Sequence, residues 1–251
     1  MIRVAIDGPA GVGKSSTSKA LARHFGFAYL DTGAMYRACA WWCLHQGIDL
    51  DGDQVDEQQI TEAVAEFFTG DHFDIGVDPD HPSITADGED ISEAIRSSEV
   101  SSHVSKVSNV IPVRNVLIAA QRAYIAAQSA DDSFSHGRGV VAEGRDITDV
   151  VEPGAEVRIL LTAREEVRQA RRNRQEQTGG VGSDDVAKRD AADSKVTHFT
   201  EASDGVTTID NSDIDFGETL DLMIGLVDDA IEEQAYRQYA ANLDDYELDE
   251  G

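Results

Sequence analysis

Residues 8–15 read GPAGVGKS and lie between two segments of different periodicity. The residues before them, MIRVAID, contain the β-branched Ile2, Val4 and Ile6, which are typical of a buried strand. The residues after them, STSKALARHF, repeat apolar side chains at helical spacing. A strand, a glycine-rich loop, a Lys-Ser pair and a helix, in this order, predict a phosphate-binding P-loop.

The chemistry of this loop follows from its residue types. Glycines allow consecutive backbone N–H groups to turn inward around phosphate oxygens, and the positive end of the following helix faces the same anion. Lys14 is expected to reach the β- and γ-phosphates, and the Ser15 hydroxyl to ligate Mg²⁺. The alternative is an ordinary glycine-rich turn, but the flanking strand and helix favour the P-loop. The candidate phosphate-binding residues of the loop are Gly8, Pro9, Ala10, Gly11, Val12, Gly13, Lys14, Ser15 and Ser16.

Length and composition place the chain among ordinary globular proteins. Its 251 residues are 41% hydrophobic, which suffices for a full core in one large domain or two small ones. No apolar run is long enough to span a bilayer, and the N-terminal residues predict a strand rather than a signal peptide. We therefore expect a cytoplasmic protein that does not bind membranes.

The chain is strongly acidic. It carries 48 Asp and Glu against 21 Lys and Arg, a formal net charge of −27. Such a surface repels phosphodiester backbones, which argues against nucleic acid as a partner. Adaptation to salt and plain solubility both remain open as reasons for the excess of acid.

The order of the remaining elements predicts the fold class. Apolar strand-like runs alternate with helical segments, which favours parallel βαβ units in a three-layer α/β core with a parallel sheet. The region 51–109 departs from this alternation. Its short β-like runs, HFDIGV and SITA, are broken by Pro79, Pro82 and an Asp87-Gly88 turn, which predicts a small antiparallel hairpin. We interpret it as an insertion that covers the carboxyl ends of the strands, where ligands bind in such sheets.

Three motifs together carry a family resemblance. The stretches IDGPAGVGKSSTSKALA, YLDTGAMYR and VAEGRDI resemble the bacterial cytidylate kinase family, which consists of P-loop nucleoside monophosphate kinases. The resemblance extends to about residue 212. It implies ATP and CMP or dCMP as substrates, with Mg²⁺ bound to the ATP. We expect the protein to be a monomer or only weakly associated.

The resemblance also implies a division of the chain. The kinase core comprises residues 1–33, 112–162 and 196–235, and the NMP-binding region with the hairpin insertion comprises residues 34–111. A helical lid follows over 163–195. Residues 236–251 form an acidic tail that we expect to be disordered.

An acceptor phosphate requires its own cationic clamp, because guanidinium donors match phosphate oxygens in pairs. Arg37 in DTGAMYR and Arg145 in EGRD both follow predicted strand ends and would face the P-loop, with the Thr32 hydroxyl as a further donor. Surface ion pairs with Asp31 and Asp146 are the alternative interpretation of the two arginines.

The resemblance assigns recognition of the base to Ser105, Arg114 and Asp146. Cytosine presents an amino donor beside two acceptors, so a carboxylate together with an arginine suits it. Uracil has an acceptor in place of the amino group, and a carboxylate would discriminate against it. By residue type alone, Ser105 and Arg114 could equally be exposed helical residues.

The predicted lid begins with an arginine-rich helix, AREEVRQARRNRQEQ, before a glycine-rich joint. Some of these arginines would pair with neighbouring glutamates on a solvated face. We nevertheless expect Arg168 and Arg171 to bind ATP in a lid that excludes water. Beyond the joint, the resemblance implies that Arg189 contacts the transferring phosphate and the acceptor, and that Asp193 holds the ribose hydroxyls. The chain departs from the family pattern at Val196, where an arginine is usual.

Glu143 ends the predicted strand VVA at a position where a carboxylate would reach Mg²⁺ through water. With it, the candidate set is complete: the catalytic candidates are Lys14, Arg145 and Arg189; the CMP-binding candidates are Thr32, Arg37, Ser105, Arg114, Arg145, Asp146, Arg189 and Asp193; the metal candidates are Ser15 and Glu143.

Two other functions compete with this interpretation. A P-loop kinase for another nucleoside monophosphate, or for a small metabolite such as shikimate or gluconate, would share the loop, but a metabolite kinase has no need of an insertion that encloses a base. A GTP-hydrolysing switch would need an Asn-Lys-x-Asp guanine reader, and the chain contains no Asn-Lys pair.

Overall fold

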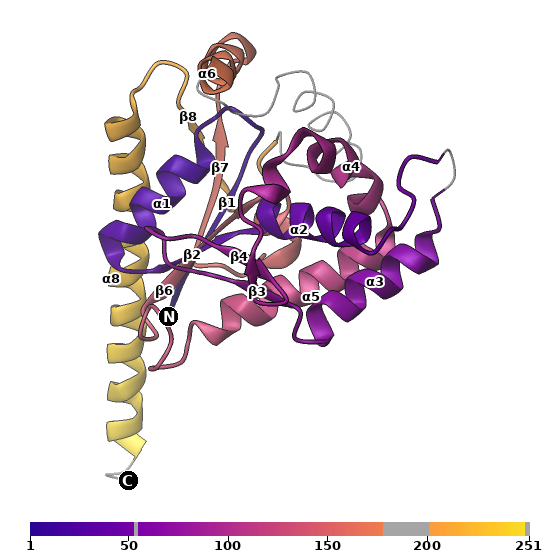
Figure 1. Cartoon of the computed structure of the whole chain (residues 1–251). Helices are drawn as coiled ribbons and strands as arrows, with labels where there is room; N and C mark the ends of the chain where they lie inside the picture. Colours follow the sequence, from indigo (N-terminus) through magenta and orange to yellow (C-terminus); the bar gives the residue numbers. More distant parts are fainter. Residues whose placement is uncertain (53–54, 178–200, 249–251) are drawn as a thin grey trace.

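A parallel sheet forms the centre of the protein in a computed structural model that describes residues 1–52, 55–177 and 201–248 (Figure 1). In that part of the chain the sheet has five strands in the order β2-β6-β1-β7-β8, all pairs parallel. The strands are β1 (Ile2–Asp7), β2 (Ala28–Asp31), β6 (Gly139–Gly144), β7 (Val157–Thr162) and β8 (Thr207–Asp210).

Alternate residues of the strands enter two different cores, because successive side chains of a strand point to opposite faces of the sheet. In β1, Val4 and Ile6 enter one cluster of buried apolar residues and Ala5 enters the other. In β6, Val141 and Ala142 separate in the same way. The sheet is therefore buried on both faces, and the predicted three-layer α/β class is confirmed.

Helices cover both faces. Helices α1 (Lys14–Phe25) and α8 (Phe216–Leu248) lie on one of them and contact each other. The other face carries α2 (Thr32–His45), α3 (Glu57–Thr69), α4 (Ser98–Ser108) and α5 (Ile111–Ala127). Helix α6 (Glu165–Gln177) follows β7 and lies beyond the carboxyl ends of the strands (Figure 1).

The predicted hairpin insertion is present as a small antiparallel sheet of β3 (Phe73–Ile75), β4 (Ile84–Ala86) and β5 (Glu89–Asp90). A 3-10 turn, η1 (Ala94–Arg96), connects it to α4. Its apolar side chains join the same cluster as α2–α5, and the backbone N–H of Tyr29 on edge strand β2 donates to the Val77 carbonyl at 2.8 Å. The insertion thus packs on the core and has no separate core of its own among the described residues.

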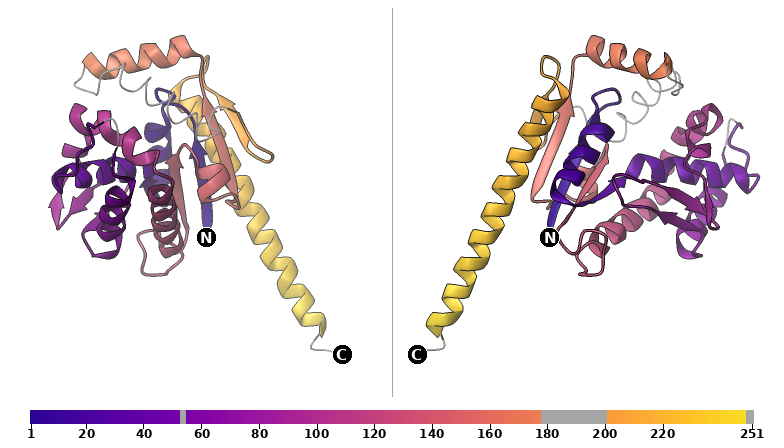
Figure 2. Two further views of the ribbon diagram at one scale, coloured as in Figure 1. Left: turned by 90° about the vertical axis from the view of Figure 1, so that its right-hand side faces the viewer. Right: turned by 60° about the vertical axis from the view of Figure 1, so that its left-hand side comes forward.

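The C-terminal segment differs from its prediction. We expected residues 236–251 to be disordered, whereas α8 continues to Leu248 and projects beyond the rest of the molecule (Figure 2). The residues of this extension, including AYRQYAANL, are mostly good helix formers, and Arg237 pairs with Glu233 one turn earlier at 2.5 Å. A helix that is already nucleated against the core extends at little cost, which overrides the repulsion between its acids.

Part of the predicted lid lies outside the described residues. Helix α6 accounts for its beginning, but residues 178–200, which include Arg189, Asp193 and Val196, are not among those that the structure describes. None of the described helices combines the length and the apolar composition that crossing a membrane requires.

The extension of α8 should contribute little to stability, because residues 231–239 are all exposed. We predict that deleting residues 236–251 shifts the thermal unfolding midpoint by less than about 2 °C, since exposed positions change stability by only about 0.5 kcal/mol. Circular dichroism during a thermal melt measures this.

A deeper deletion that begins at Met223 is the matched control. It removes Met223 and Val227, both 0% exposed, and each buried apolar side chain contributes about 2–5 kcal/mol. That variant should fail to fold. A large loss of stability in the shorter deletion would contradict the exposed helix.

Candidate active site

A cavity of about 570 Å³ opens at the carboxyl ends of the central strands. Parallel strands end at one edge of the sheet, so the loops after β1, β2 and β6 converge there. The lining comprises the loop after β1, the start of α2, the turn after β6, and side chains from α4, α5, α6 and α8. The predicted residues among them are Pro9, Ala10, Gly11, Val12, Gly13, Lys14, Ser15, Ser16, Thr32, Arg37, Arg114, Glu143, Arg145, Asp146 and Arg171.

The loop between β1 and α1 has the conformation that its glycines permit. Gly8 has φ +150°, and a Cβ there would lie 2.1 Å from the Leu161 carbonyl oxygen of the neighbouring strand. At Gly11, φ is +82° and a Cβ would lie 2.8 Å from the Arg168 carbonyl oxygen. Both positions therefore require glycine for two reasons: the backbone has a positive φ, and another element approaches too closely for a side chain.

Lys14 lies folded over the loop. Its Nζ donates to the carbonyl oxygen of Gly8 and, at 3.1 Å, to that of Pro9. Helix α1 begins at Lys14 after the left-handed Gly13, which provides no side-chain cap. The first N–H groups of a helix lack partners within it, so this terminus and the ammonium group provide a positive site at the bottom of the cavity.

Two carboxylates stand side by side next to that positive site. Asp31 and Glu143 are register partners at the ends of β2 and β6. Glu143 is 3% exposed, and burial raises its pKa; the charge of Asp31 raises it further, while Lys14 lowers it. The Tyr29 hydroxyl donates to Glu143, and both this hydroxyl and the nearby Ser15 side chain lower the pKa of the carboxylate.

This group of oxygens suits a hard cation. A cage of three or more His, Cys, Asp or Glu side chains able to hold a metal is absent from residues 1–52, 55–177 and 201–248. The hydroxyl of Ser15 and the carboxylate of Glu143 would leave most coordination positions to water and phosphate, which is how Mg²⁺ is usually bound. A cation here would also offset the burial of the Glu143 charge.

Arg145 reaches the cavity from the position directly after β6, and Arg37 reaches it from the second turn of α2. The Arg37 guanidinium is 3.8 Å from the Asp31 carboxylate. This is the ion pair that was the alternative to phosphate binding in the sequence analysis. Its Nε–H is nevertheless buried without a hydrogen-bond partner among the described residues, so a donor remains for an anion. Thr32 donates its hydroxyl to the Glu143 carbonyl at 2.8 Å. That hydroxyl is therefore already engaged within the fold.

Arg114 and Asp146 form a buried pair. Arg114, on α5, donates to the Asp146 carboxylate, which is 5% exposed and follows β6 by two residues. Burial raises the pKa of Asp146, and the guanidinium groups of Arg114 and Arg145 lower it. The centre of the Arg114 guanidinium lies 5.9 Å from the centre of the Tyr36 ring. A carboxylate, a guanidinium and an aromatic face thus occupy one end of the cavity.

Ser105 and its neighbour Ser108 differ from the prediction. Ser105 is not among the cavity-lining residues, whereas Ser108, one turn later on α4, is. The Ser108 hydroxyl is buried and has no hydrogen-bond partner among the described residues. The sequence contains seven serines from Ser92 to Ser108, and helical periodicity alone does not tell which of them faces the cavity.

The arginines of α6 contact the P-loop directly. Arg168 donates to the Ala10 carbonyl at 3.3 Å, and Arg171 donates to the side chain of Asn211 at 2.9 Å. Asn211 in turn donates to the Val12 carbonyl at 2.8 Å. Sequence reasoning missed Asn211, although its place directly after the last core strand was a usable signal. Arg168 and Arg171 are brought together with the loop, while Arg189 and Asp193 lie outside the described residues.

Comparisons with known proteins agree with the three motifs. The family model described as Cytidylate kinase matches residues 4–229. A cytidylate kinase of Streptomyces griseus is 42% identical over 90% of this chain and 92% of its own length. A cytidylate kinase of Cutibacterium acnes is 39% identical over 89% of this chain and 95% of its own length. A cytidylate kinase of Nocardia farcinica is 42% identical over 87% of this chain and 90% of its own length. A crystal structure of TT1252 from Thermus thermophilus aligns with 90% of this chain and 95% of its own at a TM-score of 0.43 and 17% identity, from which we draw nothing.

The matched region contains the P-loop, the arginines of the cavity, the buried Arg114–Asp146 pair and α6. This chain is a member of the cytidylate kinase family.

Proposed function

We propose that the protein transfers the γ-phosphoryl group of ATP to CMP or dCMP, giving ADP and CDP or dCDP. The observation that carries this proposal is the division of one cavity into a P-loop half and an arginine-lined half with a buried Arg114–Asp146 pair. Two phosphate-binding regions facing one another suit transfer between two nucleotides. A hydrolase would need only the first.

The donor half holds ATP. The N–H groups of the loop and Lys14 would bind the β- and γ-phosphates, and Arg168 and Arg171 would bind ATP from α6. These contacts position the γ-phosphorus and neutralise charge, which is most of what phosphoryl transfer requires of a protein. Mg²⁺, when bound with ATP, supplies charge neutralisation at the phosphates. Ser15 would ligate it directly, and Glu143 would hold it through water.

The acceptor half orients the nucleophile. Arg37 and Arg145 would hold the phosphate of CMP so that one of its oxygens lies in line with the bond between the γ-phosphorus and the departing β-phosphate oxygen. A bond forms from that oxygen to phosphorus as the bond to ADP breaks. Arg145 would keep contact with the phosphoryl group as charge develops on it. For Thr32 to donate to the same phosphate, its hydroxyl would have to turn away from the Glu143 carbonyl to which it now donates.

Asp146 and Arg114 would read the base. The carboxylate of Asp146 accepts from the cytosine amino group, and the Arg114 guanidinium donates to the ring acceptors. The observed pair is already formed, so little side-chain entropy is lost when the base enters. The contacts of Arg189 with the phosphates, of Asp193 with the ribose, and of Ser105 with the base are proposed from the family resemblance.

An acceptor panel tests the proposed function. Release of ADP from ATP and Mg²⁺ should be fastest with CMP and dCMP and much slower with UMP, AMP, GMP, shikimate and gluconate. A preference for another acceptor would refute the specificity. We further propose that the enzyme works as a cytoplasmic monomer, because ATP and nucleoside monophosphates are cytoplasmic metabolites and one chain holds both halves of the site.

Removal of the P-loop ammonium should affect every acceptor equally. We predict that Lys14→Ala lowers kcat with CMP and with dCMP by at least about 100-fold, because a buried cation at the transferred phosphate contributes about 3 kcal/mol or more. The coupled ADP assay measures it. Arg23→Ala, in the same helix but paired with the exposed Asp80 at 2.5 Å, is the matched control and should stay within about 2-fold. Loss with one acceptor but not the other would contradict the donor role.

The base-reading role of Asp146 predicts a change of specificity. Asp146→Asn keeps the shape of the side chain but replaces one acceptor oxygen with a donor. Its kcat/KM should fall by about 30-fold with CMP and by less than about 5-fold with UMP, since a hydrogen bond to a charged group contributes about 1.5–3 kcal/mol. Steady-state kinetics with both acceptors measures the two ratios, and UMP serves as the internal control. Equal losses would mean that other residues read the base.

A further inference from the structure

Asp7, the last residue of β1, is buried directly before the P-loop and makes three hydrogen bonds to the turn after β6. Its Oδ1 accepts from the backbone N–H of Ile147 at 3.0 Å. Its Oδ2 accepts from the backbone N–H of Thr148 at 2.8 Å and from the Thr148 hydroxyl at 2.7 Å. Both carboxylate oxygens are thus used by two consecutive residues of a single turn.

The burial of this carboxylate has to be offset by something. Asp7 is 2% exposed, and burial raises its pKa to about 6 against the lowering effect of the three hydrogen bonds. The three hydrogen bonds offset part of the cost of burying this carboxylate. A buried carboxylate often stabilises a fold no better than an apolar side chain of similar volume. Stability alone therefore does not explain why an aspartate occupies this position. Asp7 does not line the cavity and so has no direct contact with a substrate there.

The turn that Asp7 holds carries the acceptor site. Ile147 and Thr148 open the π-helical turn η2 (Ile147–Val151), and Asp146 is the residue immediately before it. Arg145 precedes Asp146. The two residues proposed to bind the phosphate and the base of CMP are therefore attached, within two peptide bonds, to the backbone groups that Asp7 binds.

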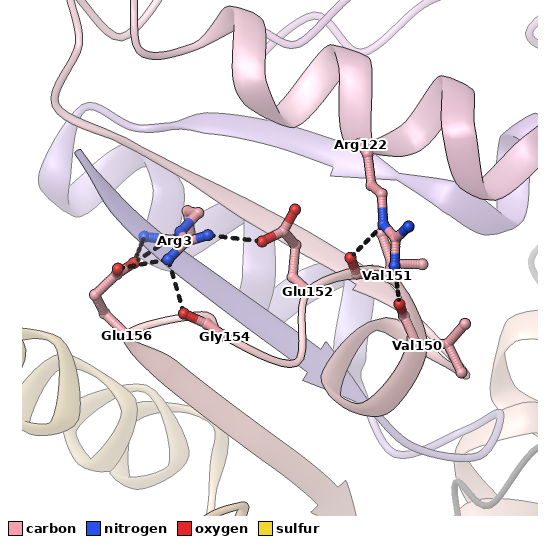
Figure 3. A network of polar contacts seen from close by, with 7 residues as sticks. All are labelled: Arg3, Arg122, Val150, Val151, Glu152, Gly154 and Glu156. Atoms are coloured by element: carbon pink, nitrogen blue, oxygen red, sulfur yellow. Dashed lines mark hydrogen bonds and ion pairs between the residues drawn. The ribbon is translucent and has the colours of Figure 1, made fainter.

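The other end of the turn is also fixed (Figure 3). Arg122 of α5 donates to the carbonyl oxygens of Val151 at 3.0 Å and Val150 at 2.7 Å. Arg3, at the start of β1, pairs with Glu152 at 2.9 Å, and it also donates to Gly154 and Glu156. The turn is thus held through its N–H groups by Asp7 and through its carbonyl groups by Arg122. π-helical turns are frequently found at functional sites.

We propose that Asp7 is a positioning residue of the acceptor half: it holds the Ile147–Thr148 backbone and so fixes Arg145 and Asp146, although it lies in the chain next to the donor loop. This inference rests on the proposed function. The competing possibility is that Asp7 supports the P-loop, which begins at the next residue. The two possibilities assign its effect to different ligands.

Separate binding of the two ligands decides between them. Asp7→Asn preserves the size of the side chain but replaces one acceptor oxygen with an NH₂ donor. That donor would face a backbone N–H, so the hydrogen bond to either Ile147 or Thr148 is lost. In the full chain, titration calorimetry with CMP should give a Kd raised by at least about 10-fold, while the Kd of a non-hydrolysable ATP analogue with Mg²⁺ stays within about 3-fold. The ratio of kcat/KM for CMP over UMP should also fall, because Asp146 loses its orientation.

Asp149→Asn is the matched control. Asp149 lies in the same turn, but its carboxylate accepts from the Ser203 hydroxyl at 2.7 Å instead of binding the Ile147–Thr148 backbone, so both affinities should stay within about 2-fold. If Asp7→Asn does not fold, Thr148→Val removes one of the three bonds and should raise the Kd of CMP alone by about 3-fold or more.

Several results would overturn the inference. Equal weakening of both ligands, or weakening of the ATP analogue alone, would assign Asp7 to the P-loop or to the fold in general. Unchanged CMP affinity in a folded variant would remove any role in positioning. These outcomes are distinct from failure of the proposed function, in which the wild-type chain itself would neither bind nor phosphorylate CMP.

Discussion

The parallel pairing of β1 with β6 is the contact on which the active site depends. Asp7 and Gly144 are partners at its end, so the P-loop and the turn that carries Arg145 and Asp146 leave the sheet side by side. The end of β6 also lies close to the start of α2, since a Cβ at Gly144 would be 2.5 Å from the Thr32 hydroxyl. A slip of this register by one residue would reverse which face each side chain enters and would separate the two halves of the cavity.

Charge compensation is the second constraint. The chain carries a formal charge of −27, yet guanidinium groups gather in the cavity, where they face buried carboxylates. Asp7, Glu143 and Asp146 all have a raised pKa because of burial, and each has hydrogen bonds or a nearby cation that opposes the shift. The phosphates of a nucleotide would neutralise the arginines of the cavity, whereas only a cation would offset the buried carboxylates.

Local patterns account for most of what could be predicted. Short stretches, whose backbone geometry depends on their own residues, predict the P-loop, the α/β class, the antiparallel insertion and the placement of Arg145 directly after a strand. The prediction for Ser105 was less secure: the buried valines of α4 mark the face that packs on the core, but they do not tell which serine beside that face lines the cavity, and Ser108 does so. The prediction that the chain is disordered after Ala235 was wrong, because α8 continues to Leu248. The acidic composition favours disorder, but helix propensity and nucleation by the core outweigh it.

What the sequence determined by itself was the chemistry of the donor loop: glycines at strained positions, one ammonium and one hydroxyl, in an order that only phosphate explains. Tertiary structure decided which residues stand opposite it. Asp7 illustrates the difference, because in the sequence it is one more acid before a glycine, whereas in the fold it binds Ile147 and Thr148, 140 and 141 residues away. Hydrogen bonds between residues so distant depend on strand order and register, and these are properties of the whole sheet.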